Sequence, residues 1–340
     1  MKAGIEKIER PCPLCSEKAY RLIASGIDHE YRTTTSDRFN VVECVSCGLK
    51  YLNPRPADSE LGVIYPPDYY SNWIGSEYEE AARRGALMLK VRLWYYEKKY
   101  RKLARLCQVI PDKDRTPFRV LDVGSGDGRL LTIVKDLYER EFGGPCETYG
   151  VEYSKKSIEG ARARGHEMYQ GDICDLDIPK RFHFIISNDV IEHVADPLAH
   201  GKRLADLLLP GGILQVQTPN IDAWDWTLCK KYWGGYHLPR HWTFFTTRSL
   251  SNLLRDNGLE IVEIEYFSSA VFWNWTFHAI LTKWRLRSLG DRLFHPVKIY
   301  GNSFQVFLFL MTFSLIDEVI KRLSGRTSNM NIYARKPLPG

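Results

Sequence analysis

The feature that most constrains the fold of this chain is the stretch VLDVGSGDGRLL at residues 120–131. An apolar run that reads as a buried strand reaches an acidic residue, passes three glycines in five positions and resumes in a helical pattern. Glycine lets the backbone adopt unusual angles and lets a ligand approach it closely. A strand, a bare loop and a helix in this order predict a ligand-binding turn at the carboxyl end of a parallel strand.

This loop differs from two common phosphate-binding loops. A dinucleotide fingerprint would place its third glycine one position later, where this chain has Arg129. A P-loop would contain Gly-Lys followed by serine or threonine, and the loop has no such sequence. The spacing is D-x-G-x-G-x-G, running from Asp122 through Gly124, Gly126 and Gly128. Taken alone, these glycines fit a simple turn about equally well, so the context has to decide.

Strand and helix patterns alternate after the loop, which predicts an α/β fold with a doubly wound, Rossmann-like parallel sheet and its ligand at the carboxyl ends of the strands. The expected second strand ends at Glu152, and Asp172 follows the third. A carboxylate at the tip of the second strand can accept from both hydroxyls of a ribose. Asp172 is placed to accept from the exocyclic amine of an adenine.

These motifs together resemble the class I S-adenosylmethionine-dependent methyltransferases over roughly residues 118–267. The matching stretches are VLDVGSGDG, GVEYS, GDICD and LPGGILQVQTPN, in that order. The preface with CGLKYLNPRP and the later HLPRHWTFFTTRSL further resemble a bacterial subgroup with an N-terminal zinc ribbon. The resemblance implies a seven-stranded sheet, S-adenosyl-L-methionine as methyl donor, and acceptors among sugars, lipids and other small molecules.

The resemblance also implies a set of cofactor-binding residues, with the aminoacyl end of the cofactor against the glycines. Asp122 is expected to orient the loop and the amino group of the cofactor. The expected cofactor-binding residues are Asp122, Gly124, Ser125, Gly126, Gly128, Glu152, Asp172, Ile173 and Asn188.

Two segments offer catalytic candidates. The turn SNDVIEHVADP contains Asp189 and His193 and is similar to E-x-x-E-H-V in ubiquinone-type O-methyltransferases, where the acidic turn has been linked to a divalent metal. Asp189 replaces the first glutamate and has a shorter reach, which weakens the case for a metal. The loop GGYHLPRHWTFFTTRSL contains His237 and His241, before a helix that we expect to be capped at Thr247.

Histidine titrates near working pH, so we select His241 as the general base for a hydroxyl or carbon acceptor. His193 and Asp189 are the other catalytic candidates. For both histidines a structural role, holding the turn or the loop, stays open.

Four of the eight cysteines form two C-x-x-C pairs near the start of the chain: Cys12, Cys15, Cys44 and Cys47. The segments YRLIAS and FNVVEC beside them read as short strands. Two such pairs can supply four thiolates to one tetrahedral Zn²⁺ and leave no open position for catalysis. We therefore expect a structural zinc that stabilises a ribbon too thin for its own core, with four metal-free thiols as the alternative.

An apolar insertion separates the expected sixth strand, LEIVEIEYF, from the expected last strand, NMNIYARKP. Its longest apolar stretch, Phe304–Ile316, has thirteen residues, whereas about 20 are needed to span a bilayer. Tryptophans and basic residues accompany it, among them Trp273, Trp275 and Trp284. We expect residues 270–325 to contact a membrane interface, and packing on the domain or on a second subunit of a homodimer is the open alternative.

The chain therefore divides into five expected parts: 1–56 a zinc-ribbon-like domain, 57–115 a linker with an amphipathic helix from Ala86 to Cys107, 116–268 the cofactor-binding core, 269–328 the insertion, and 329–340 the last strand and tail.

The expected function is methyl transfer to a small-molecule, saccharide or lipid-linked acceptor, at oxygen or carbon. The start MKAGIEKIERPCPLC has no apolar core of signal-peptide length, so we expect a cytoplasmic protein, at the inner face of the membrane if the insertion binds lipid. An RNA-directed methyltransferase and a non-catalytic, membrane-associated cofactor-binding scaffold are the alternatives. The fourth strand lacks the N-P-P-Y type turn of exocyclic-amine methyltransferases, and the net charge of +6 is mild, so nucleic acid is not the expected partner.

Overall fold

The computed structural model describes residues 4–31, 33–66, 69, 97, 100–101, 117–300 and 303–338. Nearly all of the amphipathic helix expected from Ala86 to Cys107 lies outside these residues.

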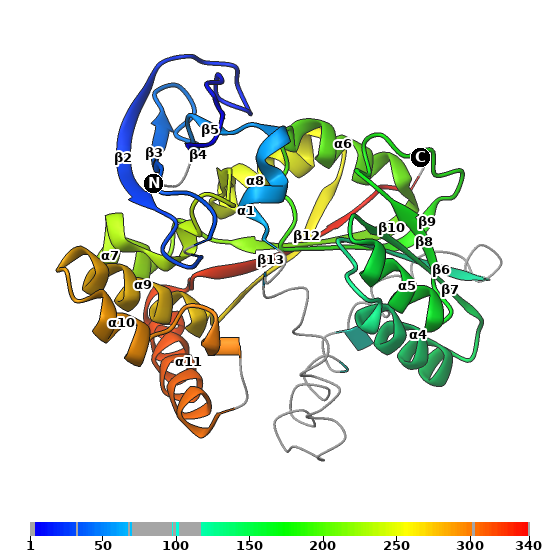
Figure 1. Ribbon diagram of the computed structural model, residues 1–340. Coiled ribbons are helices and arrows are strands. Elements are labelled where there is room, and N and C mark those ends of the chain that lie inside the picture. Colours follow the sequence, from blue (N-terminus) through cyan, green and yellow to red (C-terminus); the bar gives the residue numbers. More distant parts are fainter. Residues whose placement is uncertain are drawn as a thin grey trace.

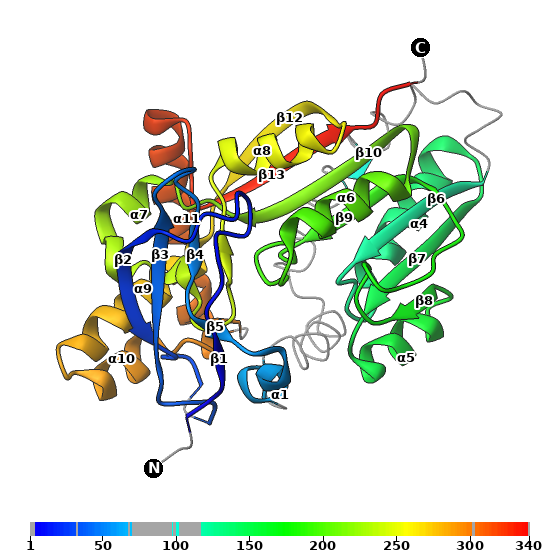
Figure 2. The same cartoon turned by 90° about the horizontal axis from the view of Figure 1, so that it is seen from above.

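A seven-stranded sheet runs through the molecule in the order β12-β13-β10-β9-β6-β7-β8 (Figures 1 and 2). The five strands β10, β9, β6, β7 and β8 pair in parallel with their neighbours in this order. β13 is antiparallel to both of its neighbours, β10 and β12. The strand bounds are β6 Phe118–Val123, β7 Cys146–Glu152, β8 Glu167–Gln170, β9 Phe182–Asn188, β10 Leu208–Pro219, β12 Glu260–Phe267 and β13 Asn329–Arg335. The doubly wound, Rossmann-like sheet predicted from the alternating pattern is therefore confirmed.

Helices cover this sheet on both faces, which is why its central strands are apolar along nearly their whole length. β9, for example, buries every residue except its last. The covering helices are α4 Arg129–Phe142, α5 Lys155–Ala163, α6 Pro197–Leu207 and α8 Thr247–Asp256. The cap predicted for α8 is wrong by one residue, because the Thr246 hydroxyl accepts from the Ser249 N–H while Thr247 is already helical.

The N-terminal segment forms a smaller sheet in the order β11-β4-β3-β2. Three strands come from the segment itself, but β11 follows β10 in the chain and pairs antiparallel with β4. The loop after β10 is thereby hydrogen-bonded to the N-terminal segment. The bounds are β1 Lys7–Ile8, β2 Tyr20–Ile27, β3 Arg38–Cys44, β4 Lys50–Leu52, β5 Arg55–Pro56, α1 Leu61–Ile64 and β11 Thr243–Phe244.

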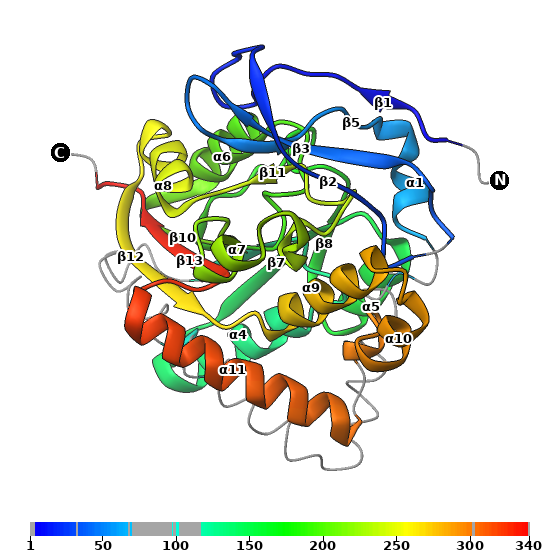
Figure 3. The same cartoon turned by 90° about the vertical axis from the view of Figure 1, so that its left-hand side faces the viewer.

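Between β12 and β13 the described residues form three α-helices that gather on one side of the molecule (Figure 3). These are α9 Ala270–Lys283, α10 Arg287–Leu293 and α11 Phe304–Ser324. Another short helix, α7 Trp224–Cys229, lies outside the insertion and follows β10. α11 continues past the apolar stretch that ends at Ile316. Among the described helices none is by itself long and apolar enough to cross a bilayer, although Arg287–Tyr300 and Phe304–Ser324 pass that test as a pair bent by 86°.

Candidate active site

The loop after β6 has the conformation that its glycines permit. Gly124, Gly126 and Gly128 have φ angles of +76°, +54° and +77°, in the left-handed region that other residues rarely adopt. A β-carbon at Gly124 would come within 2.7 Å of the Val190 side chain, whereas one at Gly126 would meet no described heavy atom within 4 Å. The loop therefore leaves open space beside Gly126, where a ligand can approach the backbone.

Glu152, the last residue of β7, fixes this loop through its carboxylate. Its Oε2 accepts a hydrogen bond from the Gly126 N–H at 3.0 Å. Its Oε1 accepts from the N–H groups of Tyr153 and Ser154 at 2.8 and 2.9 Å. A carboxylate has about four acceptor sites, so three amide donors hold Glu152 at the strand edge and leave capacity for a ligand hydroxyl.

Asp172 follows β8 and is tied to the end of β7. Its Oδ2 accepts from the Tyr153 hydroxyl at 3.0 Å, and its Oδ1 accepts from the Cys174 N–H at 2.8 Å. β7 and β8 are paired so that Glu152 lies opposite Gln170. Glu152 and Asp172 therefore come from neighbouring strand ends. Ile173, next to Asp172, is buried in the core.

The remaining residues expected at the cofactor support the loop from the strands beneath it. Asp122 is buried in β6, with Gly150 of β7 as its register partner. The Ser125 hydroxyl is directed at β7, since a β-carbon at Gly150 would lie 2.5 Å from it. Asn188 ends β9, and its side-chain oxygen accepts from the Gln215 amide at 2.7 Å.

The turn after β9 carries two acidic side chains in different surroundings. Asp189 has a φ of +54°, and its carboxylate accepts from the Gln217 amide at 2.9 Å. Glu192 is buried; its Oε2 accepts from the Thr218 hydroxyl at 2.9 Å, and its Oε1 has no hydrogen-bond partner among the described residues. Burial, assisted by the Asp189 charge, raises the pKa of Glu192 well above its ordinary value.

Three histidine rings meet beside this turn. The ring centroids of His193 and His241 are 4.7 Å apart, and those of His237 and His241 are 4.8 Å apart. The Nδ1 of His241 lies 2.9 Å from the Gly235 carbonyl. The Nδ1 of His193 lies 3.0 Å from the Arg240 carbonyl and 2.9 Å from the Tyr65 hydroxyl. A carbonyl only accepts, so the Nδ1 of His241 carries a proton and its neutral ring keeps its lone pair on Nε2.

Burial also keeps these rings neutral at working pH. It lowers the pKa of His193 to about 4. Burial and the neighbouring His193 lower the pKa of His241 well below its ordinary value. The ligand atoms of Glu192, His193 and His241 lie within 4.8 Å of one another. Two imidazoles and a carboxylate in this arrangement could hold a divalent metal ion, and Asp189 is not part of the group.

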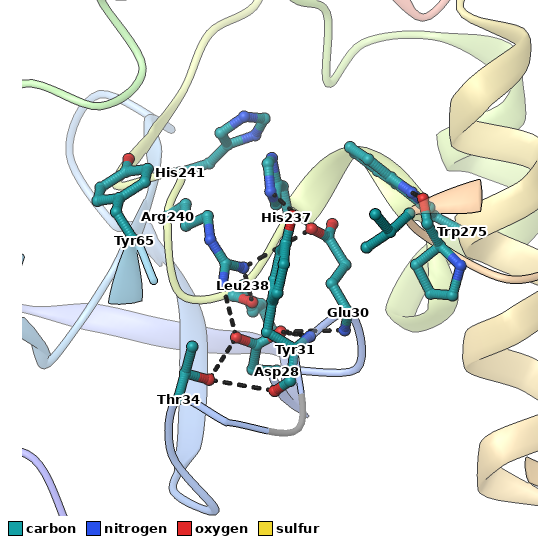
Figure 4. Close-up of polar contacts among 12 residues, drawn as sticks. Asp28, Glu30, Tyr31, Thr34, Tyr65, His237, Leu238, Arg240, His241 and Trp275 are labelled. Atoms are coloured by element: carbon teal, nitrogen blue, oxygen red, sulfur yellow. Dashed lines mark hydrogen bonds and ion pairs between the residues drawn. The ribbon is translucent and has the colours of Figure 1, made fainter. Parts of the chain in front are cut away.

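A buried ionic network joins the histidine loop to the N-terminal segment (Figure 4). The Arg240 guanidinium donates to Asp28 Oδ2 at 2.8 Å, with both side chains fully buried. It also lies 4.8 Å from the ring centroid of Tyr31. Glu30 of the same segment places its Oε2 3.1 Å from Nε2 of His237. Side chains of the segment after β2 therefore hold the loop that carries the histidines.

The charges in this network are set by burial and by Arg240. Burial alone would raise the pKa of Asp28, but the Arg240 charge lowers it below its ordinary value. For Glu30 burial prevails and raises the pKa to about 7. Neither residue belongs to a recognisable motif, and Asp28 lies 212 positions from Arg240. No local pattern in the sequence marks Asp28, Glu30 and Arg240 as partners, because only the tertiary structure brings them together.

The four N-terminal cysteines converge at the base of the small sheet. The sulfur atoms of Cys12 and Cys47 are 3.5 Å apart, as are those of Cys15 and Cys44, and all four lie within 4.8 Å of one another. A tetrahedral zinc with sulfur at about 2.3 Å brings its ligands to similar separations. This donor set fits a single Zn²⁺.

Comparison with known proteins gives a family match over the core. A family model described as "Methyltransferase domain" matches residues 95–264, half of the chain. The chain is 27% identical to a ubiquinone biosynthesis O-methyltransferase of Cereibacter sphaeroides over 175 residues, which are 47% of this chain and 68% of that protein. It is 31% identical to a trans-aconitate 2-methyltransferase of Rhodopseudomonas palustris over 109 residues, 31% of this chain and 41% of that protein.

Solved structures with a similar arrangement include a putative sarcosine dimethylglycine methyltransferase from Galdieria sulphuraria. That match has a TM-score of 0.46 and 13% identity, and covers 74% of this chain and 87% of the other. The N-methyltransferase NodS from Bradyrhizobium japonicum, in complex with S-adenosyl-L-homocysteine, matches with a TM-score of 0.39 and 12% identity over 71% of this chain and 86% of the other.

Proposed function

The chain belongs to the methyltransferase domain family, and from this premise we propose that it moves a methyl group from S-adenosylmethionine to an oxygen or carbon of a small-molecule, saccharide or lipid-linked acceptor. The observation that carries the proposal is the 3.0 Å hydrogen bond between the Gly126 N–H and Glu152 Oε2. It joins a glycine-rich loop to a carboxylate on the neighbouring strand end, which suits a ligand with an aminoacyl group and a ribose.

The residues at this edge of the sheet fit the cofactor. The open space beside Gly126 would take its aminoacyl end, and Glu152 would accept from a ribose hydroxyl. Asp172, on the next strand end, would lie on the adenine side. When bound, the cofactor supplies a methyl group already activated on a sulfonium. The protein's own part is mainly to align the acceptor with that methyl group.

His241 is the proposed general base. Its Nδ1–H is held by the Gly235 carbonyl at 2.9 Å, which leaves the Nε2 lone pair to take a proton from an acceptor hydroxyl or carbon. Its lowered pKa keeps the ring neutral and able to accept that proton. Glu192 Oε1 lies 4.0 Å from His241 Nε2.

A divalent cation at the same place is the second candidate for activating the acceptor. The observation in its favour is the convergence of Glu192, His193 and His241 within 4.8 Å. The two roles exclude each other, since a metal would occupy the Nε2 lone pair of His241. Dialysis against a chelator distinguishes them: activity that survives metal removal favours the base, and activity restored by an added divalent cation favours the metal.

In the N-terminal segment we propose a structural Zn²⁺ bound by Cys12, Cys15, Cys44 and Cys47. Each C-x-x-C pair is followed by a residue with positive φ, Ser16 at +61° and Gly48 at +73°. The two halves of the site therefore have matching turns.

The experiment that tests the function uses S-adenosylmethionine with an isotopically labelled methyl group. The purified protein is incubated with this donor and cell extract, and small molecules and lipids are separated and examined for the label by mass spectrometry. The proposal expects label in a defined compound with the wild-type protein and none with the Glu152→Ala variant. No labelled compound from any extract, despite cofactor binding, would contradict catalysis.

A further inference from the structure

Helix α11 presents a continuous apolar face to solvent. Of its 21 residues only Asp317 is buried. Seven large apolar residues of α11 are exposed, and six of them recur at spacings of three or four positions and therefore share one face. The six are Phe304, Leu308, Met311, Leu315, Val319 and Leu323, and the seventh, Ile316, follows Leu315. At about 1.5 Å per residue this face is roughly 30 Å long.

Contacts on the opposite face of α11 fix the rotation of the helix about its own axis. The Phe313 ring packs against Trp273, with centroids 5.5 Å apart. Asp317 accepts from the Trp273 indole N–H at 2.8 Å and from the Ser268 hydroxyl at 2.6 Å. A rotation that hid the apolar face would leave these buried polar groups without their partners. The exposure of the apolar face is therefore built into the packing of α11 on α9.

Other segments of the insertion also expose apolar side chains. Large apolar side chains of α10 and the end of α9 are exposed as well, namely Trp284, Leu286, Leu289 and Leu293. α9, α10 and α11 lie together on the side of the molecule away from α4 and α5 (Figures 1 and 2). Monomeric proteins rarely expose so large an apolar surface unless something binds it.

The net charge of the insertion indicates which kind of partner binds its apolar surface. Residues 270–325 contain seven lysines and arginines but three acidic residues, so they hold +4 of the chain's net charge of +6. One of the three acids, Asp317, is buried and hydrogen-bonded to Trp273. Another, Asp291, is paired with His278 at 2.9 Å. The exposed basic residues beside the apolar surface include Lys283, Arg285, Arg292 and Lys298.

We propose that α10 and α11 bind the surface of an anionic lipid bilayer, with the apolar face of α11 in the headgroup region and the basic residues among the lipid phosphates. An apolar face next to exposed tryptophan and cations matches a helix that lies in the interface. A second copy of this chain fits less well, because two insertions of net charge +4 would meet with like charges. The inference does not depend on which acceptor the enzyme uses.

Vesicle flotation tests this with the full-length protein. Vesicles of phosphatidylcholine alone are compared with vesicles that also contain phosphatidylglycerol. The test variant is Leu308→Gln/Leu315→Gln, and the matched control is Leu22→Gln/Leu338→Gln, two exposed leucines outside the insertion. Binding of S-adenosylmethionine in solution, equal in all proteins, shows that each variant is folded.

The proposal expects the wild type and the control to float with anionic vesicles and not with neutral ones. The test variant should lose roughly tenfold in partitioning for each leucine removed. Arg285→Gln/Arg292→Gln should lose roughly fivefold for each charge removed. Absence of wild-type flotation with anionic vesicles would overturn the proposal. So would a stable dimer in sedimentation that Leu308→Gln/Leu315→Gln dissociates, since α11 would then be a subunit interface.

Discussion

Asp28 and Arg240, 212 positions apart in the sequence, form an ion pair of 2.8 Å in which neither side chain is exposed to solvent. Asp28 follows β2 of the N-terminal segment, and Arg240 lies between His237 and His241 in the loop after β10. Together with the β4–β11 pairing, this ion pair fixes the N-terminal segment to the loop that carries His241, the proposed general base.

Asp28→Asn is expected to destabilise the protein by about 3–5 kcal/mol, because it removes the nearest countercharge of a buried guanidinium and leaves the more distant Glu30 Oε2, 3.8 Å from Arg240 Nη1. Asp206→Asn, which breaks the exposed Lys202–Asp206 pair of similar length (2.7 Å), should cost less than about 1 kcal/mol. The free energy of unfolding in urea measures both. Equal losses for the two variants would show that the buried pair does not hold the segments together.

Acid sensitivity should be traceable to His200, a buried residue of α6 outside the candidate site. Burial lowers its pKa to about 4, partly opposed by the Asp172 charge. Below the ordinary pKa of about 6.5 the unfolded chain takes up a proton that the folded protein refuses. The contribution is therefore fully present above pH ~6.5 and is lost as pH falls toward the folded-state pKa.

The corresponding measurement is the unfolding free energy of wild type and His200→Leu at pH 8 and at pH 5. This histidine should account for a loss of about 2 kcal/mol at pH 5 relative to pH 8, so the variant should show a correspondingly shallower pH dependence. Parallel pH dependences for the two proteins would contradict the assignment.

Zinc content distinguishes the two interpretations of the N-terminal cysteines. The wild type should carry one zinc per chain, and Cys47→Ser should lose most of it. Cys174→Ser, which changes another exposed thiol, should retain it. Metal binding can supply on the order of 10 kcal/mol of apparent folding free energy, so a chelator should also make residues 4–56 sensitive to protease. If the wild type purified under reducing conditions contains no zinc, the zinc proposal is wrong and the four cysteines are metal-free thiols.

His241→Gln should lower kcat by roughly 10²- to 10⁴-fold and leave the affinity for S-adenosylmethionine nearly unchanged. Since the pKa of His241 lies well below its ordinary value, the ring stays neutral as pH falls. The wild-type rate should therefore be flat between pH 8 and pH 6. A rate that falls with a midpoint near pH 6.5 would point to a different, solvent-exposed base.

The large sheet could be predicted from the sequence, because the strands of the core are marked by local features. The glycines after β6, the acid at the end of β7 and the apolar run of β9 are all visible within a few residues. The Asp28–Arg240 pair had no such signal, since ionic partners far apart in the chain are brought together by folding alone. The cap of α8 was missed by one residue because adjacent Thr246 and Thr247 carry the same side chain, and only backbone geometry separates them.

The insertion shows a different limit of sequence reasoning. Its apolar stretch and basic residues were apparent, but periodicity could not tell which face packs inward, because α11 is apolar on both sides. Contacts of Asp317 with Trp273 and Ser268 decide this. A polar residue inside an apolar helix can mark its buried face, which reverses the usual reading of amphipathic patterns.

Isothermal titration with S-adenosylmethionine and S-adenosylhomocysteine tests the central claim most directly. Wild type and Glu159→Gln, an exposed control on α5, should bind both ligands. Glu152→Gln should bind roughly 10- to 100-fold more weakly, because a charge-assisted hydrogen bond to the ribose is lost. Binding of NAD or ATP in preference to these ligands, or equal affinity in Glu152→Gln and wild type, would contradict the placement of a methyl donor at this edge of the sheet.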